Sequence, residues 1–145
     1  MKNMSNDIVE IYADGGSRGN PGQAAIGFLI YGPSKLILEQ YQECIGINTN
    51  NYAEYFAIIK ALAAAKKYDP KEVVVYTDSN LAYNQINGFW KIKDEEIKKM
   101  VSQVRKEIMN FKIFKIFYIP REKNKEADKL VNIALNLGEL KTGEK

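Results

Sequence analysis

The chain has 145 residues, of which 46% are hydrophobic and 27% charged, and its formal net charge is +3. This length is typical of one domain, and the composition excludes a mainly disordered chain. The single cysteine, Cys44, excludes an intramolecular disulfide and favours a reducing compartment. Because the chain has no histidine, Ser-His-Asp triads and histidine-based zinc sites are excluded. Catalysis would depend on carboxylates, lysines, tyrosines, hydroxyls or a cofactor.

The hydropathy of the chain gives no membrane signal. No apolar run approaches the ~18 residues that suggest a membrane span, and residues 1–7 are polar, unlike a secretory signal. We therefore expect a cytoplasmic protein with no membrane partner and, by default, a monomer. A single domain is expected over residues 1–145, with its core at about 7–137 and a flexible tail at 138–145.

The N-terminal part predicts three strands with short turns between them, which is typical of an antiparallel meander. Residues 7–13 form a β-branched and aromatic run that is expected to stop at Gly15 and Gly16. A second apolar run covers residues 23–31, and a third with looser alternation covers about 35–45.

The rest of the chain predicts helices that alternate with strands. Asn50 and Asn51 offer an N-cap for the first helix, and Gly138 is expected to end the last one. Because crossovers between parallel strands are right-handed, this order predicts a mixed sheet with helices on both faces, in which the first, fourth and fifth strands are parallel. The expected helices cover 52–67, 79–87, 94–109 and 122–137, and the expected strands 73–77 and 113–119.

Four acids are candidate metal ligands. Asp14 follows the first strand and Asp78 the fourth, so that adjacent parallel strands would bring both to one sheet edge, where open α/β sheets bind ligands. Glu54 and Asp128 lie early in helices that would start near this edge. Each alone is compatible with a turn, cap, helix-dipole or surface role. Together, beside apolar strands, they would need a shared cation, and oxygen ligands favour Mg²⁺ or Mn²⁺.

The segments that carry these acids resemble the signature segments of type 1 ribonuclease H. They occur in the family order with family-like spacing, and the resemblance covers about residues 7–137. It implies a ribonuclease H-like α/β fold, a five-stranded mixed sheet of order 3-2-1-4-5 with helices on both faces. It also implies that the four acids are the metal-binding catalytic residues. The segments are DGGSRGNPG (14–22), TNNYAEYFA (49–57), YTDSN (76–80) and NKEAD (124–128).

The resemblance further implies an activity, which is hydrolysis of the RNA strand of RNA–DNA hybrids to 5′-phosphate and 3′-hydroxyl products. Two Mg²⁺ ions about 3.5–4 Å apart, or Mn²⁺ as a substitute, would support it. The family contacts ribose 2′-hydroxyls and the hybrid backbone through polar positions. In this chain, roles in turns, in helix caps or in the core are the alternative for the matching residues. The matching residues are Gly15, Gly16, Ser17, Asn20, Thr49, Asn50, Asn51, Asn80 and Trp90.

The chain departs from the family pattern in two places. Many relatives carry a histidine in the loop before the last acid, whereas residues 120–124 read PREKN. Arg121, Glu122 or Lys123 could take its place, or the role could be absent. The basic protrusion that some relatives carry after the tryptophan is not predicted here. A positive surface or a merely solvated face could instead be formed by Lys91, Lys93, Lys98 and Lys99.

The charge balance suits a polyanionic partner. Without the four acids, the 21 basic residues stand against 14 acids, which leaves a net charge of +7. Two alternatives stay open. Double-stranded RNA could be cleaved as well, because A-form shape is shared. The chain could also be a hybrid-binding module without catalysis, although the intact acids argue against this. The glycine-rich segment lacks the Gly-Lys-Ser/Thr of a P-loop.

Overall fold

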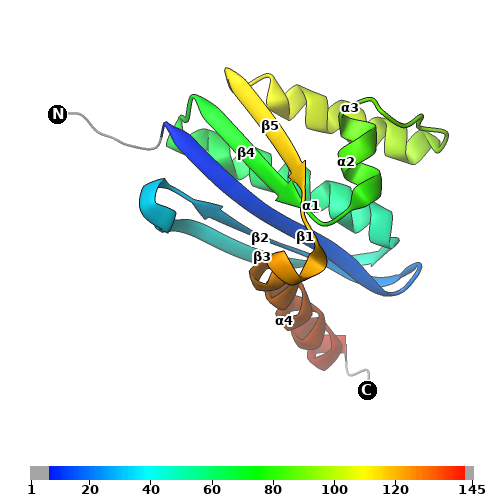
Figure 1. The fold of residues 1–145 in the computed structure, drawn as a ribbon. Coiled ribbons are helices and arrows are strands. Elements are labelled where there is room, and N and C mark those ends of the chain that lie inside the picture. Colours follow the sequence, from blue (N-terminus) through cyan, green and yellow to red (C-terminus); the bar gives the residue numbers. More distant parts are fainter. Residues whose placement is uncertain (1–6, 143–145) are drawn as a thin grey trace.

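The computed structural model describes residues 7–142 and contains a five-stranded mixed sheet of order β3-β2-β1-β4-β5 (Figure 1). β2 pairs antiparallel with both β1 and β3, whereas β4 pairs parallel with β1 and β5. The predicted sheet and its strand order are confirmed. The strands are β1 (Ile8–Gly19), β2 (Gly22–Tyr31), β3 (Ile37–Asn48), β4 (Glu72–Thr77) and β5 (Ile113–Tyr118).

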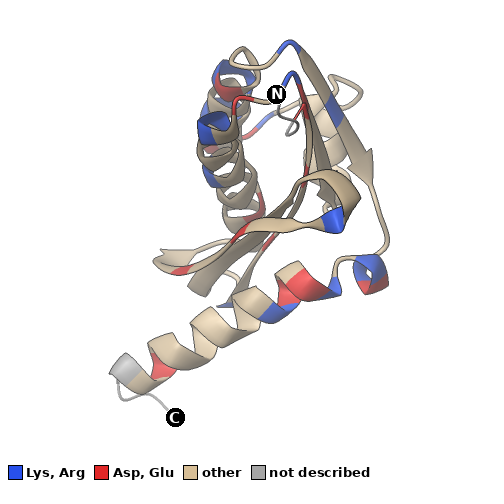
Figure 2. Cartoon of the chain, turned by 90° about the vertical axis from the view of Figure 1, so that its left-hand side faces the viewer, with Lys and Arg blue, Asp and Glu red and all other residues tan. Residues whose placement is uncertain are grey.

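Helices cover both faces of the sheet. α1 packs on β1 and β2 and against α3, whereas α4 lies on the opposite face across β1, β2 and β3 (Figure 2). Residues of β2 alternate accordingly, since Ile26 and Phe28 belong to the core under α1 while Ala25 and Leu29 pack against α4. Among the described residues, no helix has the length and hydropathy needed to cross a bilayer. The α-helices are α1 (Asn50–Ala65), α2 (Asn80–Ile86), α3 (Glu95–Ile108) and α4 (Lys125–Thr142), and short 3₁₀ helices lie at Pro33–Lys35, Lys66–Tyr68 and Arg121–Lys123.

The helices α1, α2 and α3 begin at polar caps. Ser79 caps α2 and Asp94 caps α3, each accepting hydrogen bonds from backbone N–H groups of the first turn. The cap of α1 is Thr49, whose Oγ1 accepts from the Tyr52 N–H at 3.1 Å, and not Asn50 or Asn51 as predicted. Asn50 is instead the first helical residue, which leaves its side chain free to bind the β1–β2 hairpin.

The prediction that β1 stops at Gly15 and Gly16 is wrong. β1 continues through both glycines, antiparallel to β2, as far as Gly19. Gly15 serves a close approach, because a Cβ there would lie 2.2 Å from the Ala53 carbonyl oxygen of α1. The missing side chain therefore lets the first turns of α1 rest directly on β1.

A second close approach lies on the other face of the hairpin. Gly27 of β2 pairs with Asp14 of β1 in the sheet register. A Cβ at Gly27 would lie 2.8 Å from the Leu130 Cβ and 2.9 Å from the Ala127 carbonyl oxygen of α4. Such distances require a shift of backbone, so that only glycine allows α4 to sit at this depth.

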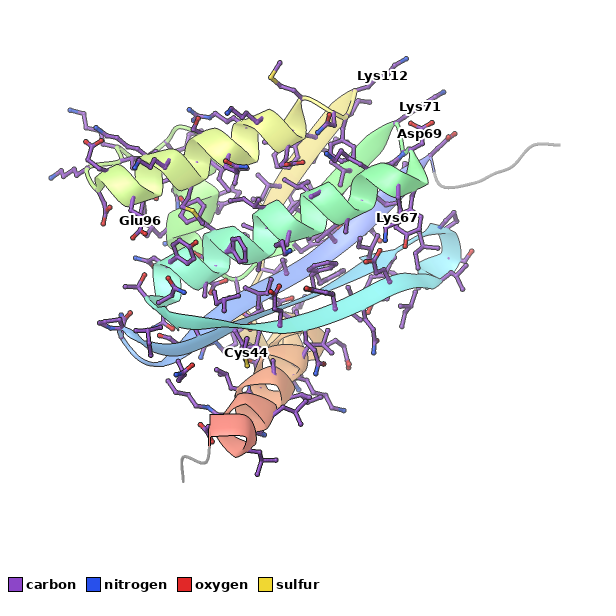
Figure 3. All side chains as sticks on the ribbon, turned by 180° about the vertical axis from the view of Figure 1, so that it is seen from behind. Cys44, Lys67, Asp69, Lys71, Glu96 and Lys112 are labelled. Carbon is purple, nitrogen blue, oxygen red and sulfur yellow. The ribbon has the colours of Figure 1, made fainter. Side chains whose placement is uncertain are left out.

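The C-terminal helix also differs from the prediction. α4 begins at Lys125 and continues through Gly138 to Thr142, so that the flexible tail expected from residue 138 is wrong as far as residue 142. Residues 143–145 lie outside the described residues. The Cys44 thiol of β3 faces α4 (Figure 3) and donates to the Ala134 carbonyl at 2.8 Å. A Cβ at Gly138 would lie 2.7 Å from the Cys44 sulfur, so this glycine serves packing and does not end the helix.

We expect Gly27→Ala to lower the free energy of unfolding by about 1–3 kcal/mol, because the added methyl group pushes α4 away from β2. Gly16→Ala is the matched control, since its Cβ would meet no heavy atom closer than 3.8 Å. Urea denaturation of both variants measures the difference. Equal stabilities would show that α4 does not depend on the close approach at Gly27.

Candidate metal centre

Three of the four acids meet at the carboxyl edge of the β1–β4 pair. The parallel register extends to Tyr12 and Tyr76, and Asp14 and Asp78 each lie two residues beyond it. Glu54 reaches the same edge from the start of α1. One carboxylate oxygen from each of Asp14, Glu54 and Asp78 lies within 4.8 Å of the other two. The sequence therefore predicted correctly that these side chains converge.

Asp128 joins the cluster from the opposite face of the sheet. It lies in the first turn of α4, and its charge helps to raise the pKa of both Asp14 and Asp78. Asp14, Glu54 and Asp128 line one cleft of about 420 Å³. The closeness of Asp128 to Asp14 follows from the depth of α4 at Gly27, which is the register partner of Asp14.

Burial and mutual repulsion make the anionic form of this cluster unfavourable. Asp14 is 6% exposed, and its burial, together with the charges of Asp78 and Asp128, raises its pKa to about 8. Burial first, and then the charges of Asp14 and Asp78, raise the pKa of Glu54 well above its usual range. The Glu54 Oε1 atom is buried and has no hydrogen-bond partner among the described residues. Crowded oxygen donors with no histidine or cysteine fit a hard divalent cation.

The loop before α4 brings one of its three charged residues to the acids. The Arg121 guanidinium lines the cleft and partly offsets the burial that raises the pKa of Glu54 and Asp78. Glu122 and Lys123 line a different cavity, together with Tyr12 and Tyr31. Of the three residues considered for the place of the family histidine, Arg121 is therefore the one that faces the site.

Part of the predicted substrate-binding set surrounds this cleft. The members of this set that line it are Gly15, Gly16, Ser17, Asn50 and Asn51. The Ser17 N–H donates to Asn50 Oδ1 at 2.8 Å, and the Asn50 N–H donates to Asn20 Oδ1 at 3.0 Å. These bonds fix the β1–β2 hairpin to the start of α1, so that Asn20 supports the cleft without lining it.

The remaining predicted substrate-binding residues lie outside the lining of the cleft. Thr49 caps α1, and Asn80 accepts hydrogen bonds from the Asn84 amide through its carbonyl and Oδ1 atoms. Trp90 is 45% exposed on the link between α2 and α3. None of the three is among the described residues that line the cleft, and their contact with a substrate stays a prediction. The link contains no helix, which agrees with the expected absence of a protrusion.

Sequence reasoning missed Asn124, which is 1% exposed beside the acids and donates to the Asp78 carboxylate. Its only sequence signal is its place as the first residue of the segment NKEAD. An asparagine directly before a helix is usually a cap, so its burial and its partners far along the chain gave no separate signal.

The raised pKa values predict how pH affects stability without metal. Asp14 has a folded-state pKa of about 8 and an ordinary value of 3.8, so that the folded state holds its proton through this interval while the unfolded state loses it. The stability that the Asp14 proton contributes is therefore fully present below about pH 4 and is lost as pH rises toward 8. Asp14→Asn removes the charge, and we expect it to raise the free energy of unfolding by about 1–2 kcal/mol at pH 8 in EDTA.

Urea denaturation at several pH values checks this expectation. The difference between Asp14→Asn and the unaltered chain should grow from pH 4 to pH 8 and should shrink when a divalent cation is added. A variant that is no more stable at pH 8 than the unaltered chain would contradict the electrostatic analysis.

The comparisons with known proteins agree with this geometry. Residues 12–134 match the protein family described as reverse transcriptase-like. Ribonuclease HI of Halobacterium salinarum is 37% identical over 128 residues, which cover 88% of this chain and 64% of that protein. A bifunctional protein of Mycobacterium tuberculosis is 37% identical over 88% of this chain but only 35% of its own length. This chain thus spans less than two thirds of each of these two relatives.

Solved structures give the same result. The crystal structure of RNase H1 from Halobacterium salinarum has a TM-score of 0.86 and 36% identity, covering 89% of this chain and 98% of that one. LC11-RNase H1, solved in complex with an RNA/DNA hybrid, has a TM-score of 0.85 and 37% identity, covering 90% of this chain and 98% of that one. The matched segments, the sheet order and these similarities show that the chain belongs to the type 1 ribonuclease H family.

Proposed function

We propose that this chain is a metal-dependent endoribonuclease that hydrolyses the RNA strand of RNA–DNA hybrids, leaving 5′-phosphate and 3′-hydroxyl ends. The observation that carries the proposal is the convergence of the Asp14, Glu54 and Asp78 carboxylates within 4.8 Å, beside Asp128. The hybrid bound by LC11-RNase H1, a structural neighbour at 37% identity, supports the substrate class.

We propose Mg²⁺ as the cofactor, with Mn²⁺ as a substitute and two ions in the centre. The four acids would hold them, since all their donors are carboxylate oxygens and repel one another without a cation. Such ions, when bound, lower the pKa of a coordinated water and stabilise the charge that develops on the leaving oxygen. A cytoplasmic location and a monomeric state stay predictions.

The residues around the acids have roles in binding and orientation. Gly15, Gly16 and Ser17 line the cleft. A Cβ at Gly16 would meet no heavy atom closer than 3.8 Å, so the missing side chain there leaves room for a nucleic acid to approach. Asn50 and Asn20 hold this segment on α1. The chain outside the four acids is net basic, so that we expect hybrid binding to weaken as salt rises.

Asp14→Asn should reduce Mg²⁺-dependent cleavage of a labelled RNA–DNA hybrid by at least about a hundredfold. The substitution removes one of the converging carboxylates, while its nearly equal shape and the relief of repulsion keep the fold. A gel assay with and without Mg²⁺, with circular dichroism to verify folding, measures the effect. Cleavage by the folded variant at the unaltered rate would overturn the assignment of the site.

The same assay separates the alternatives for the substrate. Double-stranded RNA and double-stranded DNA of the same sequence are tested in parallel with the hybrid. Cleavage of the hybrid alone supports the proposal, and cleavage of both the hybrid and double-stranded RNA would extend the substrate class to A-form duplexes. Tight hybrid binding without cleavage in Mg²⁺ or Mn²⁺ would instead indicate a binding module.

Arg121→Ala should lower the cleavage rate by about tenfold or more, because a fixed positive charge is lost from the cleft beside Glu54 and Asp78. Lys123→Ala is the matched control, since this residue lies in the same 3₁₀ helix but lines the other cavity. Rates at saturating Mg²⁺ compare the two. A larger loss in Lys123→Ala would contradict the role given to Arg121.

A further inference from the structure

Asn124 links the elements that carry three of the four acids. Its Nδ2 atom donates to the Ala13 carbonyl of β1 at 2.9 Å and to Asp78 Oδ2 at 3.2 Å. Its backbone carbonyl accepts from the Asp128 N–H at 3.1 Å. One residue at the junction of the 3₁₀ helix and α4 thus contacts the neighbour of Asp14, the carboxylate of Asp78 and the backbone of Asp128.

The orientation of the Asn124 amide is determined by its surroundings. A carbonyl oxygen can only accept, so that the amide nitrogen must face Ala13, and an amide turned the other way would place two acceptors together. The second N–H of the same nitrogen then serves Asp78. Because the side chain is 1% exposed, it has little room to rotate, and it restricts the Asp78 carboxylate from one side.

A helix-capping role does not account for this side chain. A capping asparagine accepts backbone N–H groups of the first helical turn through its Oδ1 atom. Asn124 Oδ1 is buried and has no hydrogen-bond partner among the described residues, and the side chain acts through its nitrogen. The two bonds that the side chain donates go to β1 and to Asp78 and not to α4, so the side chain joins these elements and does not cap the helix.

We infer that Asn124 is a positioning residue that holds Asp78 against Asp14 and Asp128, and that it thereby sets the affinity of the centre for divalent cations. This inference rests on the proposed function, which makes these acids the metal ligands. Replacing a residue that hydrogen-bonds to a metal ligand and orients it usually weakens metal binding by about 10–100-fold.

The test uses two variants, Asn124→Ala and Asn124→Leu. Leucine has nearly the shape of asparagine but donates nothing, so that it fills the buried volume and isolates the loss of the hydrogen bonds. Mn²⁺ is titrated into the full chain without nucleic acid, and electron paramagnetic resonance of the free ion reports the dissociation constant. We expect both variants to bind Mn²⁺ at least about tenfold more weakly than the unaltered chain.

Gln85→Ala is the control for a general loss of stability. Gln85 is also a buried amide with two hydrogen bonds, accepting from the Tyr55 hydroxyl at 2.6 Å and donating to the Lys91 carbonyl at 3.3 Å. Its Mn²⁺ affinity should stay at the unaltered value. Unchanged Mn²⁺ affinity in both Asn124 variants, or an equal loss in Gln85→Ala, would overturn the inference.

Cleavage of the hybrid at increasing Mg²⁺ keeps this test separate from the proposed function. The Asn124 variants should need at least about tenfold more Mg²⁺ for half-maximal cleavage, with the rate partly recovered at high Mg²⁺. If the unaltered chain cleaves and the variants follow the same Mg²⁺ dependence, Asn124 has no positioning role and the proposed function stands. If the unaltered chain does not cleave the hybrid, the proposed function fails, and the Mn²⁺ titration still decides whether Asn124 sets the metal affinity.

Discussion

The close contact of two helices with opposite faces of the β1–β2 hairpin is the constraint on which the site depends. At Gly15 the backbone of α1 occupies the place of a Cβ, and at Gly27 the side chain and backbone of α4 do the same. The first contact brings Glu54 to Asp14, and the second brings Asp128 to it. Three elements that are far apart in the chain therefore bring their acids to one edge of the sheet only because two side chains are missing.

These contacts bring carboxylates together in a buried place, where their anionic form is unfavourable. Burial and repulsion act in the same direction on Asp14, Glu54 and Asp78, and each has a raised pKa. The core on the α1 side contains many fully buried aliphatic side chains, and their burial stabilises the fold enough to hold an unfavourable cluster at its edge. A sequence selected for stability alone would neutralise one of these acids, so their joint presence is evidence for a use that needs all of them.

The sequence predicts most of the strands and the acids well because both have local signals, whereas the strand order was implied by the resemblance to type 1 ribonuclease H. The apolar runs at 23–31 and 73–77 are visible without any partner. The predicted ends of β1 at Gly15 and of the last helix at Gly138 were wrong. In sequence, a glycine that ends an element cannot be distinguished from a glycine that lets another element pack closely against it. The atoms that decide between them belong to Ala53 and Cys44, which the chain brings together only in the folded state.

Asn124 could not be predicted as a site residue for the same reason. Its two side-chain partners lie 111 and 46 positions away in the chain, so nothing near it in the sequence indicates that it is buried between them. The four acids, Asn124 and the two glycines form one arrangement in which shape brings the charges together and hydrogen bonds orient them. A divalent cation would bind this arrangement in the folded chain and not in the unfolded one. Its binding would therefore stabilise the fold by mass action, and it would remove the repulsion that the metal-free protein has to sustain.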